Sequence, residues 1–362
     1  MPVLLSGHTT SISSITFSPT HLYTCDMSGH LFSWQLDRVQ SPDSRPATSF
    51  LLGHPISHAV IVRTIDGMER KRKYPKKGQE EEEVDEVEGA VGERTSRVGG
   101  VDDRALVAVS SGGGSLVVGS TVDRSLLCCA STNGRLFLLD MEQAAIAAEL
   151  RMHVRPQVVN ALAVAPNGLV AGSVCDGGLL AVWDVRTGDV IAKHRHALPL
   201  TAVAALTDGR FAVAGIDPVI RVYHQGRLDG SPVFTLPHHT DTVTSLAVSW
   251  DGTRLASTAM DGTVAVWDVQ PYCAGERLVK QWSGVQHGMD QALIGVAWSR
   301  DDKFIATGSG VGVACVWNAR SGDRVREVTG HTGTVNVVAF LPGSPGTLVT
   351  GGADGKVLIS EA

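Results

Sequence analysis

The stretch FTLPHHTDTVTSLAVSWDGTRLASTAMDGTVAVWDV, residues 234–269, decides the fold of this 362-residue chain. It holds short alternating strands separated by glycine turns, and its last strand ends in Trp267 and Asp268. The same strand ending, or a variant of it, returns along the chain at Trp34, Leu139, Trp183, Tyr223, Trp267, Trp317 and Ser360. From Leu139 onward, successive endings lie 40 to 50 residues apart. This period indicates repeats, each of them one small antiparallel sheet.

A histidine upstream of the strand ending is the second feature of the repeat. In six of the seven repeats it lies 26 to 30 residues before the ending: His8, His153, His194, His238, His287 and His331. A period of about 40 to 45 residues with a terminal Trp-Asp and an upstream histidine is typical of WD40 β-propeller blades. The sequence therefore predicts an all-β protein, a single seven-bladed WD40 β-propeller over residues 1–362.

The two ends of the chain indicate how the ring closes. Residues 2–6 have the pattern of a strand before the first repeat, whereas the last repeat, residues 331–360, stops after its third strand. An outer strand from the N-terminus would complete the last blade and remove two open sheet edges. We therefore expect residues 2–6 to pair with the last blade, so that the N-terminal strand closes the propeller.

The second repeat contains a charged insertion at residues 67–104, because His54 lies 85 residues before Leu139. A basic block, Arg70–Lys77, is followed by an acidic block, Glu80–Glu88. So few apolar residues cannot offset the entropy of ordering, and we expect a disordered segment within blade two. The basic block is compatible with a nuclear-import signal or an RNA-phosphate contact, and the acidic block with a basic partner. A solvated insertion without a dedicated role is the alternative.

A buried polar network explains the residue types of the repeat. Histidine, a hydroxyl residue, aspartate and tryptophan can hydrogen-bond in series and fix the turns of a blade. Counting back from the endings predicts a complete set in blade five and three members in blade seven: His238, Ser257, Asp261 and Trp267, and His331, Thr350 and Asp354. Blades one, three and six keep the hydroxyl and the indole, but their turn positions are Ser28, Gly177 and Val311. Apolar packing is expected to hold these three blades.

Composition and motifs limit the function. The net charge is −6, which argues against a protein held to nucleic acid by bulk positive charge, so RNA contact is expected to be indirect or local. No stretch approaches the length of a membrane span. The chain has no phosphate-binding loop, zincin or serine-hydrolase motif, and its cysteines lack metal-site spacing. We therefore expect no catalysis, cofactor, metal or small-molecule substrate.

Residues 234–340 resemble the family of 40 kDa WD-repeat subunits of the U5 small nuclear ribonucleoprotein. The most specific pieces are the turn Ala259–Met260–Asp261, the connector from Pro271 to Arg277, and the segment from Gln286 to Ser299 that opens the sixth repeat. The resemblance implies a nuclear, non-catalytic scaffold in pre-mRNA splicing. Its implied partners are protein subunits of the U5 particle and the spliceosome, namely the large scaffold protein and the helicase.

Three apolar residues are candidates for contact with a partner. Met27, Ile216 and Met260 each precede the turn between the second and third strands of a blade, on the side of such rings that commonly binds partners. The alternative is that single exposed apolar residues need no explanation. The function also has an alternative: a WD40 adaptor in another assembly, such as a substrate receptor of a ubiquitin ligase or a cytoplasmic signalling scaffold.

Overall fold

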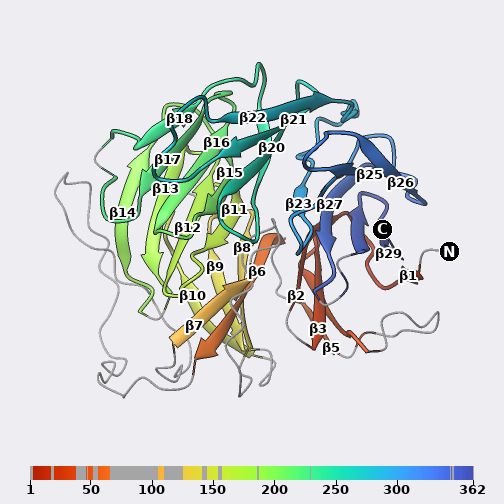
Figure 1. The fold of residues 1–362 in the computed structure, drawn as a ribbon. Helices are drawn as coiled ribbons and strands as arrows, with labels where there is room; N and C mark the ends of the chain where they lie inside the picture. Colours follow the sequence, from red (N-terminus) through yellow and green to blue (C-terminus); the bar gives the residue numbers. More distant parts are fainter. Residues whose placement is uncertain are drawn as a thin grey trace, which may run out of the picture.

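Seven antiparallel β-sheets, one for each repeat, form the computed structural model of the protein (Figure 1). The structure describes residues 3–17, 20–37, 46, 48–51, 56–65, 105–109, 125–140, 145–153, 157–185, 187–228, 230–342, 344 and 346–361. Within these ranges every regular element is a strand. The predicted all-β, seven-bladed propeller is therefore confirmed.

Each blade runs from an inner strand through a second and a third to an outer strand. The inner strands are β2 (Ile12–Phe17), β6 (Ile56–Ile65), β11 (Val159–Val164), β15 (Leu200–Ala205), β19 (Val243–Val248), β23 (Val296–Trp298) and β27 (Val335–Phe340). The second strands are β3 (His21–Asp26), β8 (Ser125–Ser131), β12 (Val170–Cys175), β16 (Arg210–Gly215), β20 (Arg254–Ala259), β24 (Phe304–Thr307) and β28 (Thr347–Gly352).

The two remaining positions of each blade are filled in the same way. The third strands are β4 (His30–Gln35), β9 (Leu136–Asp140), β13 (Leu179–Asp184), β17 (Ile220–His224), β21 (Thr263–Asp268), β25 (Val313–Asn318) and β29 (Val357–Glu361). The outer strands are β5 (Thr48–Leu51), β10 (Ala145–Leu150), β14 (Val190–Arg195), β18 (Phe234–Leu236), β22 (Leu278–Ser283), β26 (Arg324–Thr329) and β1 (Val3–Leu5).

The ring closes as predicted. Strand β1 pairs antiparallel with β29, with Val3 opposite Ile359 and Leu5 opposite Val357, so the N-terminal strand is the outer strand of blade seven (Figure 1). Each inner strand also lies beside the inner strand of the next blade, from β2 through β27 and back to β2. The described blades thus form one closed ring.

Apolar side chains fill the seams between neighbouring blades. The middle strands are buried on both faces because each sheet is covered by two others, and β13 is an apolar run for this reason. Trp34, Trp183 and Trp267 each lie next to the last residue of a third strand and are almost fully buried. Burying large side chains in this way is the main contribution to the stability of the ring.

Blade two differs from the prediction, because it contains five strands. The additional strand β7 (Ala105–Val109) pairs antiparallel with β6, on the inner edge of the sheet. The run ALVAV is apolar throughout and directly follows the charged stretch, so the repeat pattern does not indicate a strand there. The predicted disordered insertion at residues 67–104, with its basic and acidic blocks, lies outside the described residues.

A collar of hydrogen bonds joins neighbouring blades around the central channel. The second residue of an inner strand donates its side-chain hydrogen to the backbone of the next blade: Asn160 to Leu200, Thr201 to Val243, Thr244 to Ile294, and Asn336 to Ile12. In blade six Gly295 has no side chain, and its amide donates to the Asn336 carbonyl instead. The collar holds the inner strands in register around a channel of about 390 Å³.

Candidate protein-binding face

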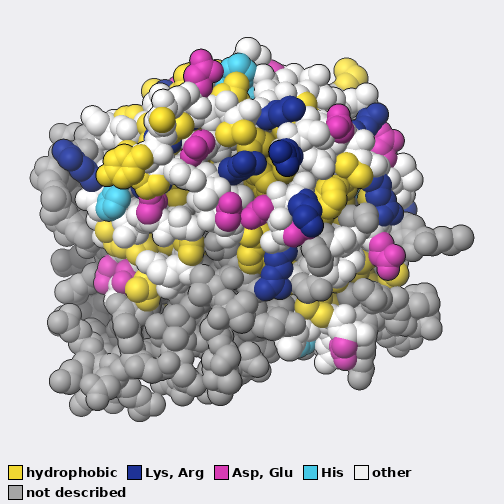
Figure 2. Space-filling view, in the orientation of Figure 1, with side chains coloured by type: hydrophobic (Ala, Val, Ile, Leu, Met, Phe, Trp, Pro, Cys, Tyr) yellow, Lys and Arg dark blue, Asp and Glu magenta, His cyan; other side chains and the backbone are white. Residues whose placement is uncertain are grey.

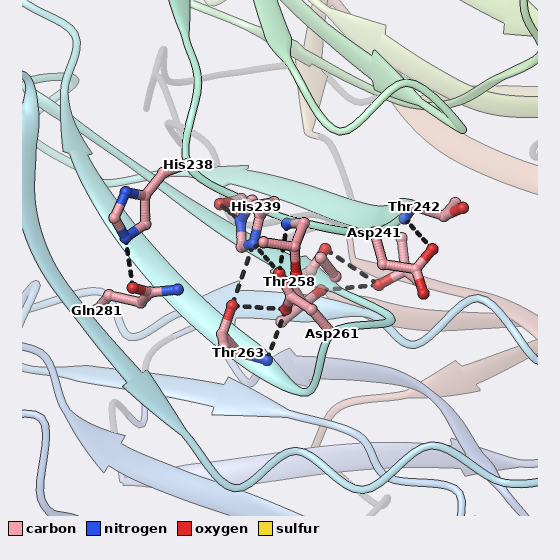
Figure 3. A network of polar contacts seen from close by, with 12 residues as sticks. His238, His239, Asp241, Thr242, Thr258, Asp261, Thr263 and Gln281 are labelled. Carbon is pink, nitrogen blue, oxygen red and sulfur yellow. Dashed lines mark hydrogen bonds and ion pairs between the residues drawn. The ribbon is translucent and has the colours of Figure 1, made fainter.

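Blade five contains a complete polar network beneath its turn (Figure 3). Trp267 Nε1 donates to Ser257 Oγ at 2.8 Å, and Ser257 Oγ lies 2.7 Å from His239 Nε2. His239 Nδ1 lies 3.1 Å from Asp261 Oδ2. Because a carboxylate only accepts, the imidazole donates from Nδ1 and receives the serine hydroxyl at Nε2. The hydrogen bonds therefore run from the Trp267 indole to the Asp261 carboxylate, and the indole, the serine hydroxyl and the imidazole each donate once.

The prediction of His238 as the histidine of this network was wrong by one residue. Figure 3 shows the His238 ring turned away from Asp261 and toward Gln281, whose Oε1 lies 2.5 Å from His238 Nε2. His239, in contrast, is buried. Two adjacent histidines cannot be separated by counting back from Trp267, since the loops between strands vary in length.

The inner strand gives a better reference than the tryptophan. In blades one, five and seven the network histidine lies four residues before the first residue of the inner strand: His8 before Ile12, His239 before Val243 and His331 before Val335. The same offset in blade four selects His196, which lies four residues before Leu200. His194, chosen by counting back from Tyr223, belongs to the outer strand β14 of blade three.

Blade seven holds the three members that the sequence predicts. His331 Nδ1 lies 3.0 Å from Asp354 Oδ1, and His331 Nε2 lies 2.9 Å from Thr350 Oγ1. The backbone amide of Thr332 also donates to Asp354, which ties the incoming loop to the turn. Ser360 replaces the tryptophan and is buried, and its hydroxyl has no partner among the described residues.

Blade one corrects a second expectation, because it contains a complete network rather than apolar packing alone. His8 lies 2.9 Å from Asp26 and 2.7 Å from Thr24, and Trp34 donates to the same Thr24 hydroxyl at 2.9 Å. The aspartate was missed because it ends strand β3, two residues after Thr24, instead of occupying the turn position Ser28. Asp26 also accepts hydrogen bonds from the amide and hydroxyl of Ser28.

Blade three retains only part of the network. His153 Nε2 lies 3.1 Å from Ser173 Oγ, whereas His153 Nδ1 and Trp183 Nε1 have no partner among the described residues. Asp176 faces away and accepts from Asn160 of the collar.

Blade six retains still less. Trp317 donates to Thr307 at 3.0 Å, and His287 instead donates to the Ala259 carbonyl of blade five.

Burial and hydrogen bonding set the charges of the complete networks. Burial lowers the pKa of His239, although Asp261 acts in the opposite direction. Burial alone would raise the pKa of Asp261, but hydrogen bonds from Thr263 and the Thr240 amide, together with His239, hold it below its ordinary value. The same opposing effects lower the pKa values of His8 and Asp26. Near neutral pH each network therefore contains a neutral imidazole and a charged carboxylate.

Met27, Ile216 and Met260 occupy one equivalent position in three blades. Each donates its backbone amide to the residue just before an inner strand: Met27 to Ser11, Ile216 to Pro199, and Met260 to Thr242. Met27 is 42% exposed and Ile216 is 46% exposed, and Met260 is partly exposed. The shared bond places all three on one side of the ring, which we call the turn face. It carries the turns between second and third strands and the loops that enter the inner strands.

The turn face also carries apolar residues that the repeat frame did not single out. They are exposed and lie in its loops and turns: Leu198, Met289, Leu293 and Val311. Met27 and Leu293 line the mouth of the central channel. Their signal in the sequence was weak, because single apolar residues in loops are common. Exposed apolar residues of the turn face therefore lie both at the channel and away from it.

Charges do not form a large field of one sign in the view of Figure 2, where Lys and Arg side chains are interspersed with Asp and Glu. Among the described residues, no group of three or more metal-type side chains is close enough to hold an ion. No helix that could cross a membrane was found in the described part either. The turn face thus offers exposed apolar side chains to a partner.

Comparison with known proteins identifies WD40 repeats, described as WD domain, G-beta repeat, at residues 3–35, 230–268 and 322–359. The protein is thus a seven-bladed β-propeller that contains WD40 repeats.

Several similar proteins are named as a pre-mRNA-splicing factor or as a subunit of the U5 small nuclear ribonucleoprotein. The chain is 37% identical over 223 residues to the pre-mRNA-splicing factor cwf17 of Schizosaccharomyces pombe, covering 61% of this chain and 64% of that protein. It is 32% identical over 189 residues to the U5 small nuclear ribonucleoprotein 40 kDa protein of Homo sapiens, covering 51% and 52%. The protein of the same name from Dictyostelium discoideum is 32% identical over 228 residues, covering 62% and 63%. The matches thus span between half and two thirds of these relatives.

Proposed function

We propose that this protein is a non-catalytic scaffold subunit of the U5 small nuclear ribonucleoprotein and acts in pre-mRNA splicing in the nucleus. The observation that carries the proposal is the similarity to proteins named as U5 40 kDa subunits and as a splicing factor, at 31–37% identity. A closed ring supports the role, because it presents two faces and an outer edge to separate partners.

Protein rather than RNA is the proposed partner. The net charge of −6 and the interspersed charges of Figure 2 favour contacts with protein segments over direct binding of the phosphate backbone. The proposed partners are the large scaffold protein of the particle and its helicase, with any RNA contact local.

The turn face is the proposed docking surface. Met27, Ile216 and Met260 share one backbone position, and the exposed Leu198 and Val311 extend the apolar surface around them. Exposed apolar side chains that share one face are typical of a protein interface. The ring itself supplies rigidity, since the collar and the networks hold the turns in place.

Affinity purification of the tagged protein from its own cells tests the assignment. The bound proteins are identified by mass spectrometry and the bound RNAs by sequencing. Recovery of U5 RNA with the large scaffold protein and the helicase is the expected result. Recovery of a ubiquitin-ligase or signalling complex without small nuclear RNA would contradict the splicing role and leave the propeller as an adaptor of another assembly.

A further inference from the structure

Blade four lacks the polar network that blades one and five contain in full. Val213 stands where five other blades have a hydroxyl residue, namely Ser173, Ser257, Thr307, Thr350 or Thr24. Tyr223 replaces the tryptophan. Asp217 occupies the position of Asp261, but its carboxylate is paired with Arg221 at 2.6 Å. His196, at the histidine position, therefore has neither the hydroxyl nor the carboxylate that its counterparts bind.

A cavity of about 290 Å³ occupies the seam between blades three and four. This is far more space than one water molecule requires. His194, His196, Val213, Arg221 and Tyr223 line it. His196 Nε2 is buried without a partner among the described residues, which leaves its hydrogen-bonding capacity unused.

The charges around this cavity favour an anion. Asp217 and Arg221 neutralise each other, and Arg195 adds one positive charge to the lining. Burial, followed by the charges of His194 and Arg221, lowers the pKa of His196 to about 4. The imidazole is therefore neutral near pH 7 and can donate one hydrogen bond from Nε2, since no partner among the described residues fixes its tautomer.

The mouth of the cavity lies on the turn face. Leu198 lines it, and Ile216 adjoins the lining residue Asp217. Both apolar side chains are 46% exposed. A segment that docks on the turn face would therefore find an apolar surface beside an opening with hydrogen-bond donors.

We propose that this cavity receives the carboxylate of a glutamate or aspartate from a bound protein segment, with His196 donating to the carboxylate. An apolar neighbour of the acidic residue rests on Leu198 and Ile216. The incoming carboxylate becomes the partner that His196 Nε2 lacks, on the side of the ring where His239 Nε2 meets Ser257 in blade five and His331 Nε2 meets Thr350 in blade seven. The proposal goes beyond the splicing role and does not depend on it, because it specifies the side chain that a partner of this face presents.

Two peptide probes test the proposal with the full-length protein. N-acetyl-Leu-Glu-Leu-amide and its Leu-Gln-Leu counterpart differ only in the carboxylate. Binding is followed by NMR of histidine-labelled protein at pH 7. The glutamate peptide is expected to shift the His196 resonances, to raise the pKa of His196 by at least about one unit, and to bind at least about tenfold more tightly than the glutamine peptide. Equal affinity for the two peptides, or no response of His196 up to about 10 mM, would overturn the proposal.

Three variants separate binding from folding. Val213→Thr restores the hydroxyl that the other networks contain. Because this hydroxyl can hydrogen-bond to His196 Nε2 from inside the blade, the variant is expected to weaken binding of the glutamate peptide at least about tenfold. His196→Phe keeps a ring in the seam and is expected to abolish binding. His224→Gln is the control, because His224 is exposed on the same blade outside the cavity, and it should bind as the parent does. Undiminished binding by folded Val213→Thr and His196→Phe proteins would contradict the assignment.

Discussion

Blades five and four follow the same repeat frame, yet they differ in what becomes of their polar side chains. In blade five the imidazole of His239 is held between Ser257 and Asp261, and the incoming loop is tied down by the bond from the Thr240 amide to Asp261. In blade four the equivalent His196 has no such partner, and a cavity lies beside it. A repeat can therefore lose its internal network and keep its fold, because apolar packing between the blades still holds it. The polar groups that no longer have an internal partner then become available for binding.

The largest expected loss of stability comes from removing the carboxylate of a complete network, and it is compared with removal of the carboxylate in blade four. Asp26→Ala in blade one removes the fully buried acceptor of His8 and Ser28 and should lower the free energy of unfolding by about 3 kcal/mol. Asp261→Ala should cost about 1 to 3 kcal/mol in blade five for the same reason. Urea denaturation measures both.

Asp217→Ala is the matched control from blade four. Asp217 pairs with Arg221 in a partly exposed ion pair, and its loss should cost less than about 1 kcal/mol. If all three alanine variants unfold at the same urea concentration as the parent, the networks do not contribute to stability.

Acid should weaken the protein partly through His153 of blade three. Burial, with a smaller effect of Lys193, lowers the pKa of His153 to about 4 from an ordinary 6.5. A histidine with a lowered folded pKa contributes stability that is fully present above pH 6.5 and is lost as the pH falls toward 4, because the unfolded chain binds the proton first. Between pH 7.5 and pH 5 this loss is about 2 kcal/mol.

His153→Leu isolates this contribution. Urea titrations at both pH values should show a decrease that is smaller than that of the parent by the same amount. His224→Leu, at an exposed position, should leave the pH dependence of the parent unchanged. An equal decrease in the parent and the His153→Leu variant would contradict the account.

The two adjacent histidines of blade five should differ in their contribution to stability, because only one of them belongs to the network. His239→Ala should cost about 2 kcal/mol, because it leaves Ser257 and Asp261 without their shared partner. His238→Ala should change stability by less than about 0.5 kcal/mol, since His238 is exposed and meets only Gln281 and the edge-on ring of Trp267. The ranking of the two melting midpoints decides between the positions, and the reverse order would restore the prediction from the sequence.

The smallest expected change in stability comes from exchanging threonine and valine at the hydroxyl position of a blade. Thr350→Val in blade seven should cost about 1 kcal/mol, because His331 loses the partner of its Nε2. Val213→Thr in blade four should be close to neutral, since the new hydroxyl meets the unpartnered nitrogen of His196. Destabilisation of the Val213→Thr protein by more than about 2 kcal/mol would show that the new hydroxyl does not reach His196 Nε2.

The repeat period predicted most of the fold, but not which residues form the polar networks. Strand endings and glycine turns gave the number of blades, and the unpaired strand at each end gave the closure between β1 and β29. Asp26 and His239 were not predicted, because counting a fixed number of residues back from the tryptophan assumes loops of equal length and an aspartate in the turn. A side chain at the end of a strand reaches the same imidazole, as Asp26 does.

The binding surface was harder to derive. The apolar position shared by Met27, Ile216 and Met260 is visible in the sequence, since it recurs in register with the turns. The cavity of blade four is not, because it depends on Arg221 turning Asp217 away from His196.

The most direct test of the central claim, that the turn face docks this protein into the U5 particle, is one purification with three tagged proteins. The parent is compared with a variant that combines Met27→Glu, Ile216→Glu and Met260→Glu. The control combines Val190→Glu, Val279→Glu and Val325→Glu, at exposed positions on the outer strands β14, β22 and β26. The U5 RNA recovered for each tagged protein should fall at least about tenfold in the turn-face variant and stay at the parent level in the control. Equal recovery with all three proteins, at unchanged melting midpoints, would contradict the account.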